Sequence, residues 1–549
     1  MMPKRRWLVG VGVGVGVSSL LGGAACSKDP RLAPLLPPCT ASANAINLDT
    51  AAYLAIDPAA DSGCVTFAAN PSVVDSIEYL LVPQSAAGTF GDSAPFHLQT
   101  VTLAAAPPLV QAVNPSSSPP VAAVQFDGYL RHLARSGAAG VAALARSAAA
   151  PAPTPAAPQP AGPPSPGSLR RFTVCANLTC SKFQAVTARV STVGTHIAIY
   201  VDTLAPKPGL DSADLDTLKQ VFDSRLYSLA TATFGAVSDI DANSVVIVLM
   251  TGVVNKLVSA ATCQSAGFIA GFFYSPDLEV TAPASISNHG EVFYSIVADS
   301  AGTLSCRHSR TQVKRILPGT FVHELQHMIN YGQHVLVRAG QAEEGWLDEG
   351  LSKYVEELAG RSYLPGDTAT FLQYVNNNVY DAQQYLRAPG NSPLLIEFDQ
   401  GTLAEVGASW LFVRYLVDQY GDSLPGKLDQ TPLNGAVNVA TQTGQDYTTI
   451  ITRWALANWV SDLPGFTAPP ELKYTSWHFR AEYGSYPLVP STSAGSAVDV
   501  SGWLRSGSGV YHRAFQGPSA PAFTLSFRSS PSALLPLAVG ARLNVIRIR

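Results

Sequence analysis

Two short motifs restrict the fold of this chain more than any other feature. The run His323-Glu324-Leu325-Gln326-His327 is followed further along the chain by Glu349. Residues four positions apart lie on one face of an α-helix, so His323 and His327 can present two imidazoles to one metal ion. A catalytic zinc ion usually takes three protein ligands, at roughly 2.0–2.2 Å for nitrogen or oxygen, and leaves its fourth position to water. We expect Glu349 to be the third ligand, which requires a second helix packed against the first.

The residues around the first motif predict a helix with a buried face. Apolar side chains recur there at helical spacing: Phe321, Val322, Leu325, Met328 and Ile329. Pro318-Gly319-Thr320 predicts the start of this helix, and Gly332 predicts its end. A second helix is predicted over 345–359, with Glu349 near its start.

The carboxylate of Glu324 lies beside the first histidine and one turn from the second. It can reach a metal-bound water and act as general base without binding the metal. Glu324 is therefore the candidate catalytic residue, with His323, His327 and Glu349 as candidate ligands of Zn²⁺.

Other residues compete for these positions. His334 is an alternative third ligand, but it lies beyond the predicted helix end at Gly332. Asp348 or Asn330 could bond to the second nitrogen of an imidazole and so fix the ring and its tautomer. Four neighbouring glutamates are also alternatives, and we expect them to be solvated: Glu343, Glu344, Glu356 and Glu357.

At these residues the chain resembles the gluzincin metallopeptidases, in which His-Glu-x-x-His on one helix is completed by a Glu on the next. His-Glu-Leu-Gln-His-Met-Ile-Asn and Trp-Leu-Asp-Glu-Gly-Leu-Ser are similar to the hyicolysin-like family of bacterial secreted neutral metallopeptidases, over roughly residues 190–470. The resemblance implies an α+β fold with a zincin-like catalytic domain. It also implies that an extended substrate adds to an edge strand beside the metal, for which 291–297 is our candidate.

The predicted function is a zinc-dependent endopeptidase that hydrolyses peptide bonds with a metal-activated water and Glu324 as general base. The alternative is a non-catalytic cell-surface binding protein that retains a structural metal site. A serine hydrolase is disfavoured because the sequence contains no Gly-x-Ser-x-Gly. In some gluzincins a tyrosine three residues before a glycine stabilises the oxyanion, but here that place is Ala404. The remaining candidates for this role stay unranked: Tyr331, Tyr354, Tyr415 and His478.

Residues 1–26 are typical of an export signal, with three basic residues, an apolar run and small residues before Cys26. They resemble a bacterial lipoprotein signal, in which Cys26 is lipidated, although Gly23 stands where a leucine is usual. We expect the protein to be exported and either lipid-anchored in the cell envelope or secreted. The anchor would be its only membrane contact, since no stretch of the sequence is long and apolar enough to span a bilayer.

Seven cysteines are an odd number for an exported protein, and lipidation of Cys26 leaves six. Fifteen pairings are possible. We expect the sequential one because each pair falls within a single segment: Cys39 with Cys64, Cys175 with Cys180, and Cys263 with Cys306. A cysteine zinc site is the rival, but there is no Cys-x-x-Cys spacing.

The 549 residues have room for two to four domains. After the signal we expect a β-rich domain over 27–135, an Ala/Pro-rich linker or propeptide boundary over 136–170, a catalytic domain over 171–488 and a C-terminal β-rich domain over 489–549. Within the catalytic domain we predict a helix over 211–234 and another over 403–419, with strands at 185–190, 196–202, 244–250, 267–274 and 291–297.

Composition limits the partners. Charged residues make up 13% of the chain and the formal net charge is -4, so there is no electrostatic footprint for nucleic acid. We expect a monomer that acts on protein or peptide substrates.

Asp239, Asp241 and Asn243 have the spacing that opens a calcium loop, but Ser244 and Met250 occupy the places of its Gly and bidentate Glu. An Asx turn is the simpler interpretation.

Overall fold

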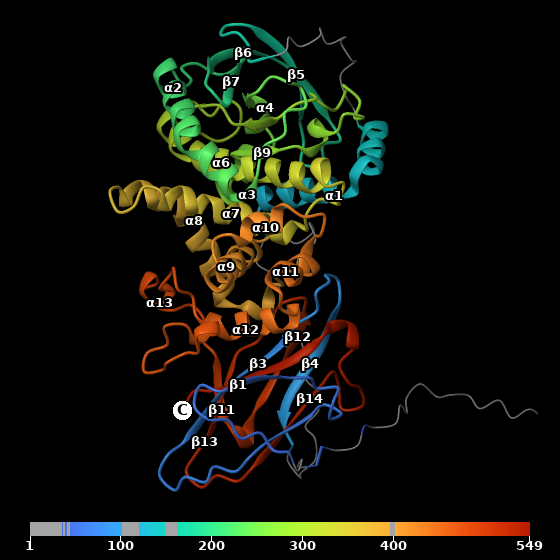
Figure 1. Ribbon diagram of the computed structural model, residues 1–549, viewed down its shortest axis with the longest axis vertical. Helices are drawn as coiled ribbons and strands as arrows, with labels where there is room; N and C mark the ends of the chain where they lie inside the picture. Colours follow the sequence, from blue (N-terminus) through green and yellow to red (C-terminus); the bar gives the residue numbers. More distant parts are fainter. Residues whose placement is uncertain (1–35, 37–38, 41–43, 102–119, 149–161, 396–400) are drawn as a thin grey trace, which may run out of the picture.

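The computed structural model describes residues 36, 39–40, 44–101, 120–148, 162–395 and 401–549. The predicted signal at 1–26, with Cys26, lies outside these residues. The fold class is α+β, as expected. An α/β lobe lies at one end of the molecule, helices form the middle, and a β-sandwich lies at the other end (Figure 1). Among the described residues, no helix is both long and apolar enough to cross a bilayer.

The sandwich combines strands from the two ends of the chain. Its five-stranded sheet has the order β1 (Tyr53–Ile56), β15 (Ala541–Arg547), β3 (Ile77–Ser85), β13 (His512–Gln516) and β11 (Ser491–Ala494). Its four-stranded sheet has the order β12 (Asp499–Arg505), β4 (Ser93–Thr100), β14 (Phe523–Arg528) and β2 (Cys64–Phe67).

The expectation of separate β-rich domains at 27–135 and 489–549 is therefore wrong. Strand β3 pairs with β13 and β15, and β4 pairs with β12 and β14, so the interior N-terminal strands have only C-terminal neighbours. The rings of Phe67 and Phe523 stack at 4.7 Å in the shared core. A few short strands cannot bury an apolar face alone, and here each terminal segment supplies the partners of the other.

The expected linker is wrong over most of its described part. Helix α1 spans Ala122–Ser147, with Gly137 (φ 57°) forming a break in its middle. Leu130, Leu133, Val141 and Leu144 are buried in the core. Alanine has the highest helix propensity, so an alanine-rich segment with leucines on one side favours a helix over an extended linker. Strand β5 (Leu169–Cys175) begins before the expected linker end at 170, and 149–161 lie outside the described residues.

The α/β lobe is built on a six-stranded sheet. Its order is β5, β6 (Phe183–Val193), β7 (Ile197–Asp202), β8 (Val246–Met250), β10 (Val292–Ser295) and β9 (Gly271–Phe273). All five predicted strands are present. The proposed substrate edge at 291–297 is wrong, because β10 pairs with β8 on one side and with β9 on the other. The free edge next to the motif helix belongs to β9.

The predicted helix over 211–234 is confirmed, with Asp211 as its cap. It runs as α2 (Ser212–Val221), a π-helical turn (Phe222–Leu226) and α3 (Tyr227–Phe234). The lobe also contains α4 (Gly252–Asn255) and α5 (Ala260–Ala266). Short 3₁₀ turns in the molecule are Ser275–Leu278, Pro389–Asn391, Pro470–Leu472, Gly495–Ala497 and Leu537–Val539.

The first motif lies on α6 (Arg310–Tyr331), which starts earlier than predicted. Ser309 caps the helix by accepting from the N–H of Gln312, and Pro318 lies inside it. Gly332 does not end the helical path, since a π-helical turn continues it over Gly332–Val337. The second motif lies on α7 (Gly345–Arg361). The remaining helices are α8 (Thr368–Arg387), α9 (Leu403–Tyr420), α10 (Leu424–Asp429), α11 (Gly435–Thr443), α12 (Tyr447–Val460) and α13 (Phe479–Glu482).

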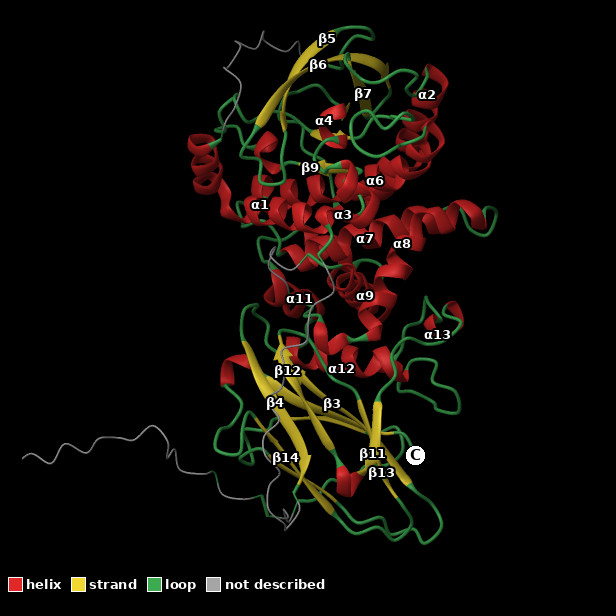
Figure 2. Ribbon diagram, turned by 180° about the vertical axis from the view of Figure 1, so that it is seen from behind, coloured by secondary structure: helices red, strands yellow, loops and turns green. Residues whose placement is uncertain are grey.

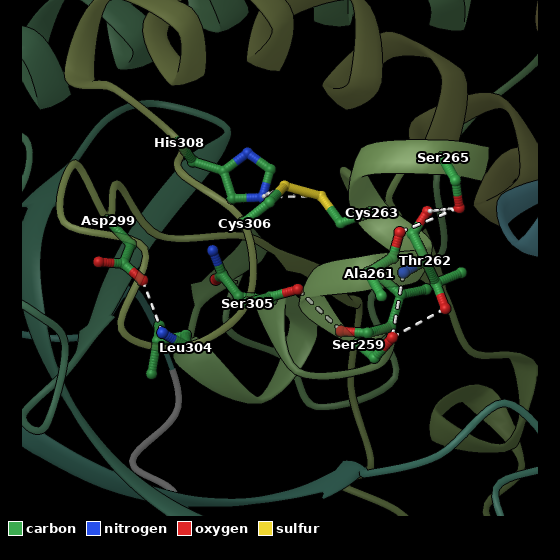
Figure 3. Close-up of a disulfide and its surroundings, with 12 residues drawn as sticks. Ser259, Ala261, Thr262, Cys263, Ser265, Asp299, Leu304, Ser305, Cys306 and His308 are labelled. Atoms are coloured by element: carbon green, nitrogen blue, oxygen red, sulfur yellow. Dashed lines mark hydrogen bonds between the residues drawn. A yellow bond between two sulfur atoms is a disulfide. The ribbon is translucent and has the colours of Figure 1, made fainter.

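The cysteines pair sequentially, as predicted. The disulfides join Cys39 to Cys64, Cys175 to Cys180 and Cys263 to Cys306. The third bond fastens α5 to the loop that leads into α6, with His308 packed against it (Figure 3).

Candidate metal centre

Helices α6 and α7 bring the predicted ligands together. The Nε2 atoms of His323 and His327 lie 3.1 Å apart. Oε1 of Glu349 lies 3.3 Å from Nε2 of His327, and Oε2 of the same residue lies 3.7 Å from Nε2 of His323. All three side chains are at most 12% exposed. The carboxylate and the two ring nitrogens therefore face one common point.

These separations fit a metal ion. Ligands at the zinc distances of a tetrahedral site are separated from one another by about 3.3 Å. Oε1 of Glu349 is buried and makes no hydrogen bond, although it lies 3.3 Å from Nε2 of His327. A buried carboxylate oxygen without a partner is costly, and a cation between it and the ring nitrogens would compensate it.

The outward nitrogens of the imidazoles have partners of their own. Nδ1 of His323 lies 2.7 Å from Oε1 of Glu356. Nδ1 of His327 lies 3.0 Å from both Oδ1 of Asp348 and Oγ of Ser352. Partners on Nδ1 direct each Nε2 toward the metal position, as in known metal-binding histidines. The predicted orienting role for Asp348 fits this geometry.

The expectation that the neighbouring glutamates are solvated is wrong. Glu343, Glu356 and Glu357 are buried, and Glu344 is half-buried. The other orienting candidate, Asn330, donates to Asp429 at 2.9 Å and contacts no imidazole. Glu343 accepts from Gly435 and Asn438 of α11, and Glu357 accepts from Trp410 and Arg414 of α9. Spacing along one helix cannot reveal such contacts with later helices.

Burial and charge act against each other in this centre. Burial and the charge of Arg131 would lower the pKa of His327, but the carboxylates of Asp348 and Glu349 outweigh them and raise it to about 10. Burial would also lower the pKa of His323, yet its hydrogen bond to Glu356 raises it. The centre thus attracts positive charge, whether a proton or a metal ion.

The fourth member of the group is Asp127 of α1, a residue that sequence reasoning missed. Its carboxylate and the ligand atoms of His323, His327 and Glu349 all lie within 4.8 Å of one another. Burial, together with the adjacent Glu349, raises the pKa of Asp127. No motif marks Asp127, because it lies far upstream in the chain and reaches the centre only through the packing of α1.

The candidate base, Glu324, is anchored on the free edge of the sheet. Its Oε2 accepts a hydrogen bond of 2.7 Å from the N–H of Phe273 in β9. It is 5% exposed, and burial raises its pKa. A carboxylate with a raised pKa holds a proton more readily near neutral pH, which suits a group that takes up and returns one.

A cavity of about 260 Å³ reaches the centre between α1 and α7. Asp127, Arg131, Glu344 and Glu349 contribute to its wall. A small molecule can therefore approach the two carboxylates from this side.

The remaining candidates lie elsewhere. Nε2 of His334 lies 3.9 Å from Glu343, and His334 is not in the ligand group. Each unranked candidate for the oxyanion has another contact: Tyr331 donates to Glu279, Tyr415 donates to the carbonyl of Glu471, His478 pairs with Asp462, and the Arg414 guanidinium covers the ring of Tyr354.

Two other groups of potential ligands occur among the described residues. Nε2 of His308 lies 3.6 Å from Sγ of Cys306, but both cysteines of this group are in the disulfide, so neither offers a thiolate (Figure 3). The second group contains Asp239, Asp241 and Glu291. Asp241 accepts from the N–H of Asn243, and Asn243 accepts from the N–H of Val245, two residues on in each case, which confirms the predicted Asx turn.

No protein-family model matches the sequence, and no curated protein matches it.

Proposed function

We propose that this protein is a zinc-dependent endopeptidase. The observation that carries the proposal is the convergence of His323 Nε2, His327 Nε2 and an oxygen of Glu349 that makes no hydrogen bond. Glu324 lies on the same helix as the two histidines. Two histidines and a glutamate are a ligand set of catalytic zinc sites in peptidases. The resemblance of the two motifs to gluzincins supports the same conclusion.

A bound zinc ion would supply a Lewis acid and lower the pKa of a water molecule. The residues of the chain supply the rest. Glu356 and Asp348 hold the two imidazoles in place, and Glu324 takes a proton from the attacking water and returns it to the leaving amine. The hydrogen bond from Phe273 keeps the Glu324 carboxylate on the side of β9, where an extended substrate would lie.

The test is metal analysis of the purified chain together with cleavage of casein before and after chelation. We expect one zinc ion per chain and activity that chelation abolishes. Glu324→Gln should keep the zinc and lose at least about a hundredfold in rate, as expected for removal of a general base. The matched control is Glu482→Gln, an exposed glutamate of α13. Full activity of Glu324→Gln would exclude the mechanism.

The second candidate is a non-catalytic surface protein with a structural zinc site. Asp127 favours it, because four protein ligands are typical of structural zinc. Two results together would support this candidate over the first. The chain would bind zinc tightly, and neither the wild type nor a variant without the Asp127 carboxylate would hydrolyse casein.

The location of the protein is also part of the proposal. We infer that it acts outside the cytoplasm, either lipid-anchored through Cys26 or secreted. The three disulfides support this, because such bonds persist in oxidising compartments. Metabolic labelling with a fatty acid, compared between the wild type and Cys26→Ser, tests the anchor.

A further inference from the structure

Helix α1 reaches the candidate metal centre from outside both motifs. It lies at the level of α6 and α7, beneath the sheet of the α/β lobe (Figures 1 and 2). Through Asp127 it adds a fourth possible ligand atom to the two imidazoles and Glu349. A tetrahedral zinc ion with four protein ligands has no position left for water. Asp127 therefore stands where the reacting water would bind.

The same helix covers the free edge of β9. The N–H of Phe273 donates to Glu324, and its carbonyl oxygen accepts a bond of 3.3 Å from Arg131 Nη2 of α1. Both backbone groups therefore point away from β10, the strand that pairs with β9. An extended peptide that joins a sheet edge bonds to such groups. Arg131 thus donates to the carbonyl oxygen of Phe273, which would otherwise accept a hydrogen bond from the backbone of a substrate strand.

Apolar and ionic contacts hold α1 in this position. Phe126 is 1% exposed and meets the ring of Phe272 edge-on at 5.1 Å. Arg131 lies over the ring of Phe273 and pairs with Asp348 at 3.3 Å. The docked face thus contacts β9 and α7 at once, which aligns Asp127 with the metal position and Arg131 with the strand.

We propose that α1 is a built-in inhibitor of this centre, in which Asp127 is a displaceable fourth metal ligand and Arg131 blocks the substrate edge of β9. The proposal rests on the proposed peptidase function, because inhibition has meaning only for an active site. Activation requires α1 to leave, after which water replaces the carboxylate and the carbonyl of Phe273 becomes free.

The experiment measures access to the metal without relying on catalysis. The full chain is loaded with Co²⁺, and acetohydroxamate, a small ligand of the metal, is titrated while the visible spectrum is followed. The cavity beside Asp127 and Glu349 gives this probe a path. The proteins are the wild type, Asp127→Ala, Asp127→Asn and Asp61→Asn. Asp61 is exposed in the turn before β2, within the sandwich, and serves as the matched control.

We expect Asp127→Ala to bind acetohydroxamate at least about tenfold more tightly than the wild type. This ratio is expected if the wild type spends at most about a tenth of the time in an open state, in which Asp127 is off the metal. Asp127→Asn should change in the same direction, and it keeps the side-chain shape if the alanine variant does not fold. Asp61→Asn should match the wild type. Equal affinity in the wild type and both Asp127 variants would overturn the proposal. Failure of both variants to retain Co²⁺ would also overturn it, because Asp127 would then be an obligatory ligand.

Casein cleavage separates this proposal from the peptidase function. A rise in rate for Asp127→Ala over the wild type supports both. Tighter probe binding with no cleavage by any variant rejects the peptidase function, while the displaceable ligand stands. An active wild type that Asp127→Ala does not exceed rejects the inhibitor.

Discussion

Oε1 of Glu356 lies 2.7 Å from Nδ1 of His323, on the side of the ring away from Glu349. Glu356 lies about two helical turns beyond Glu349 on α7, so one helix supplies both a candidate metal ligand and the group that orients another candidate ligand. The ring cannot turn without breaking this contact.

Glu356→Ala should therefore weaken zinc binding. Loss of a carboxylate that orients a metal-bound imidazole typically costs 10–100-fold in affinity, and we expect a loss of about that size. Competition with a chromophoric chelator measures it, with Glu482→Gln as the surface control. Unchanged affinity would mean that Glu356 does not orient the ring.

Glu357 is a buried acceptor that joins α7 to α9 and to the chain after α12. It accepts from Arg361, Arg414, Trp410 and Trp477. Glu357→Ala should lower the free energy of unfolding by about 3–5 kcal/mol, because it leaves the buried charge of Arg414 with fewer partners. Denaturant titration at constant pH measures the loss. Glu357→Gln, which keeps an acceptor oxygen, should lose less, and a loss below about 1 kcal/mol in the alanine variant would contradict the argument.

Asp277 should make stability depend on pH. Burial raises its pKa from 3.8 to about 7, against the hydrogen bond that it accepts from Tyr294. A carboxyl with a raised pKa in the folded state contributes stability below its unfolded pKa, and this contribution is lost as the pH rises through the folded pKa. The free energy of unfolding of the wild type, relative to Asp277→Asn, should therefore fall between pH 4 and pH 7 by about 1.4 kcal/mol per unit.

Denaturant titrations of both proteins at several pH values give this difference. An offset that is added equally at every pH reports the altered hydrogen bonds of the variant. A difference that stays constant or rises between pH 4 and pH 7 would contradict the raised pKa. Asp61→Asn should run parallel to the wild type throughout.

Truncation after residue 488 should destroy the sandwich. It removes β11 to β15, which include both neighbours of β3 and both neighbours of β4. We expect residues 44–101 of the truncated chain to be digested rapidly in limited proteolysis, because unpaired strands expose their backbone groups. Protection of this segment equal to that in the full chain would show that the N-terminal strands fold by themselves.

Patterns within single elements predicted the local structure well. The apolar spacing around His323 and His327 gave the motif helix, and that around Leu351 and Val355 gave the second helix. The start of α6 predicted at Pro318-Gly319-Thr320 is wrong. The helix begins after its cap Ser309 and continues through Pro318. The alanine-rich run before residue 148 forms the second half of α1, whereas the proline-rich residues that follow it in the sequence favour a linker.

Pairings between distant segments could not be predicted in the same way. Residues 291–297 are not a sheet edge, because β9 pairs with β10. No pattern in the sequence of either strand predicts this pairing. Arg131 and Asp127 have ordinary helical neighbours, and their role follows only from where α1 packs.

The sequence by itself selected His323, His327 and Glu349 as candidate ligands, because helical spacing places the two histidines on one face and a second predicted helix carries Glu349. It also determined the disulfide partners, which are neighbours along the chain. Only the tertiary structure decided that Asp127 joins the group, that β9 is the edge strand of its sheet, and that N-terminal and C-terminal strands share one sandwich. These depend on contacts between segments far apart in sequence, and burial of apolar faces, rather than any local pattern, selects such contacts.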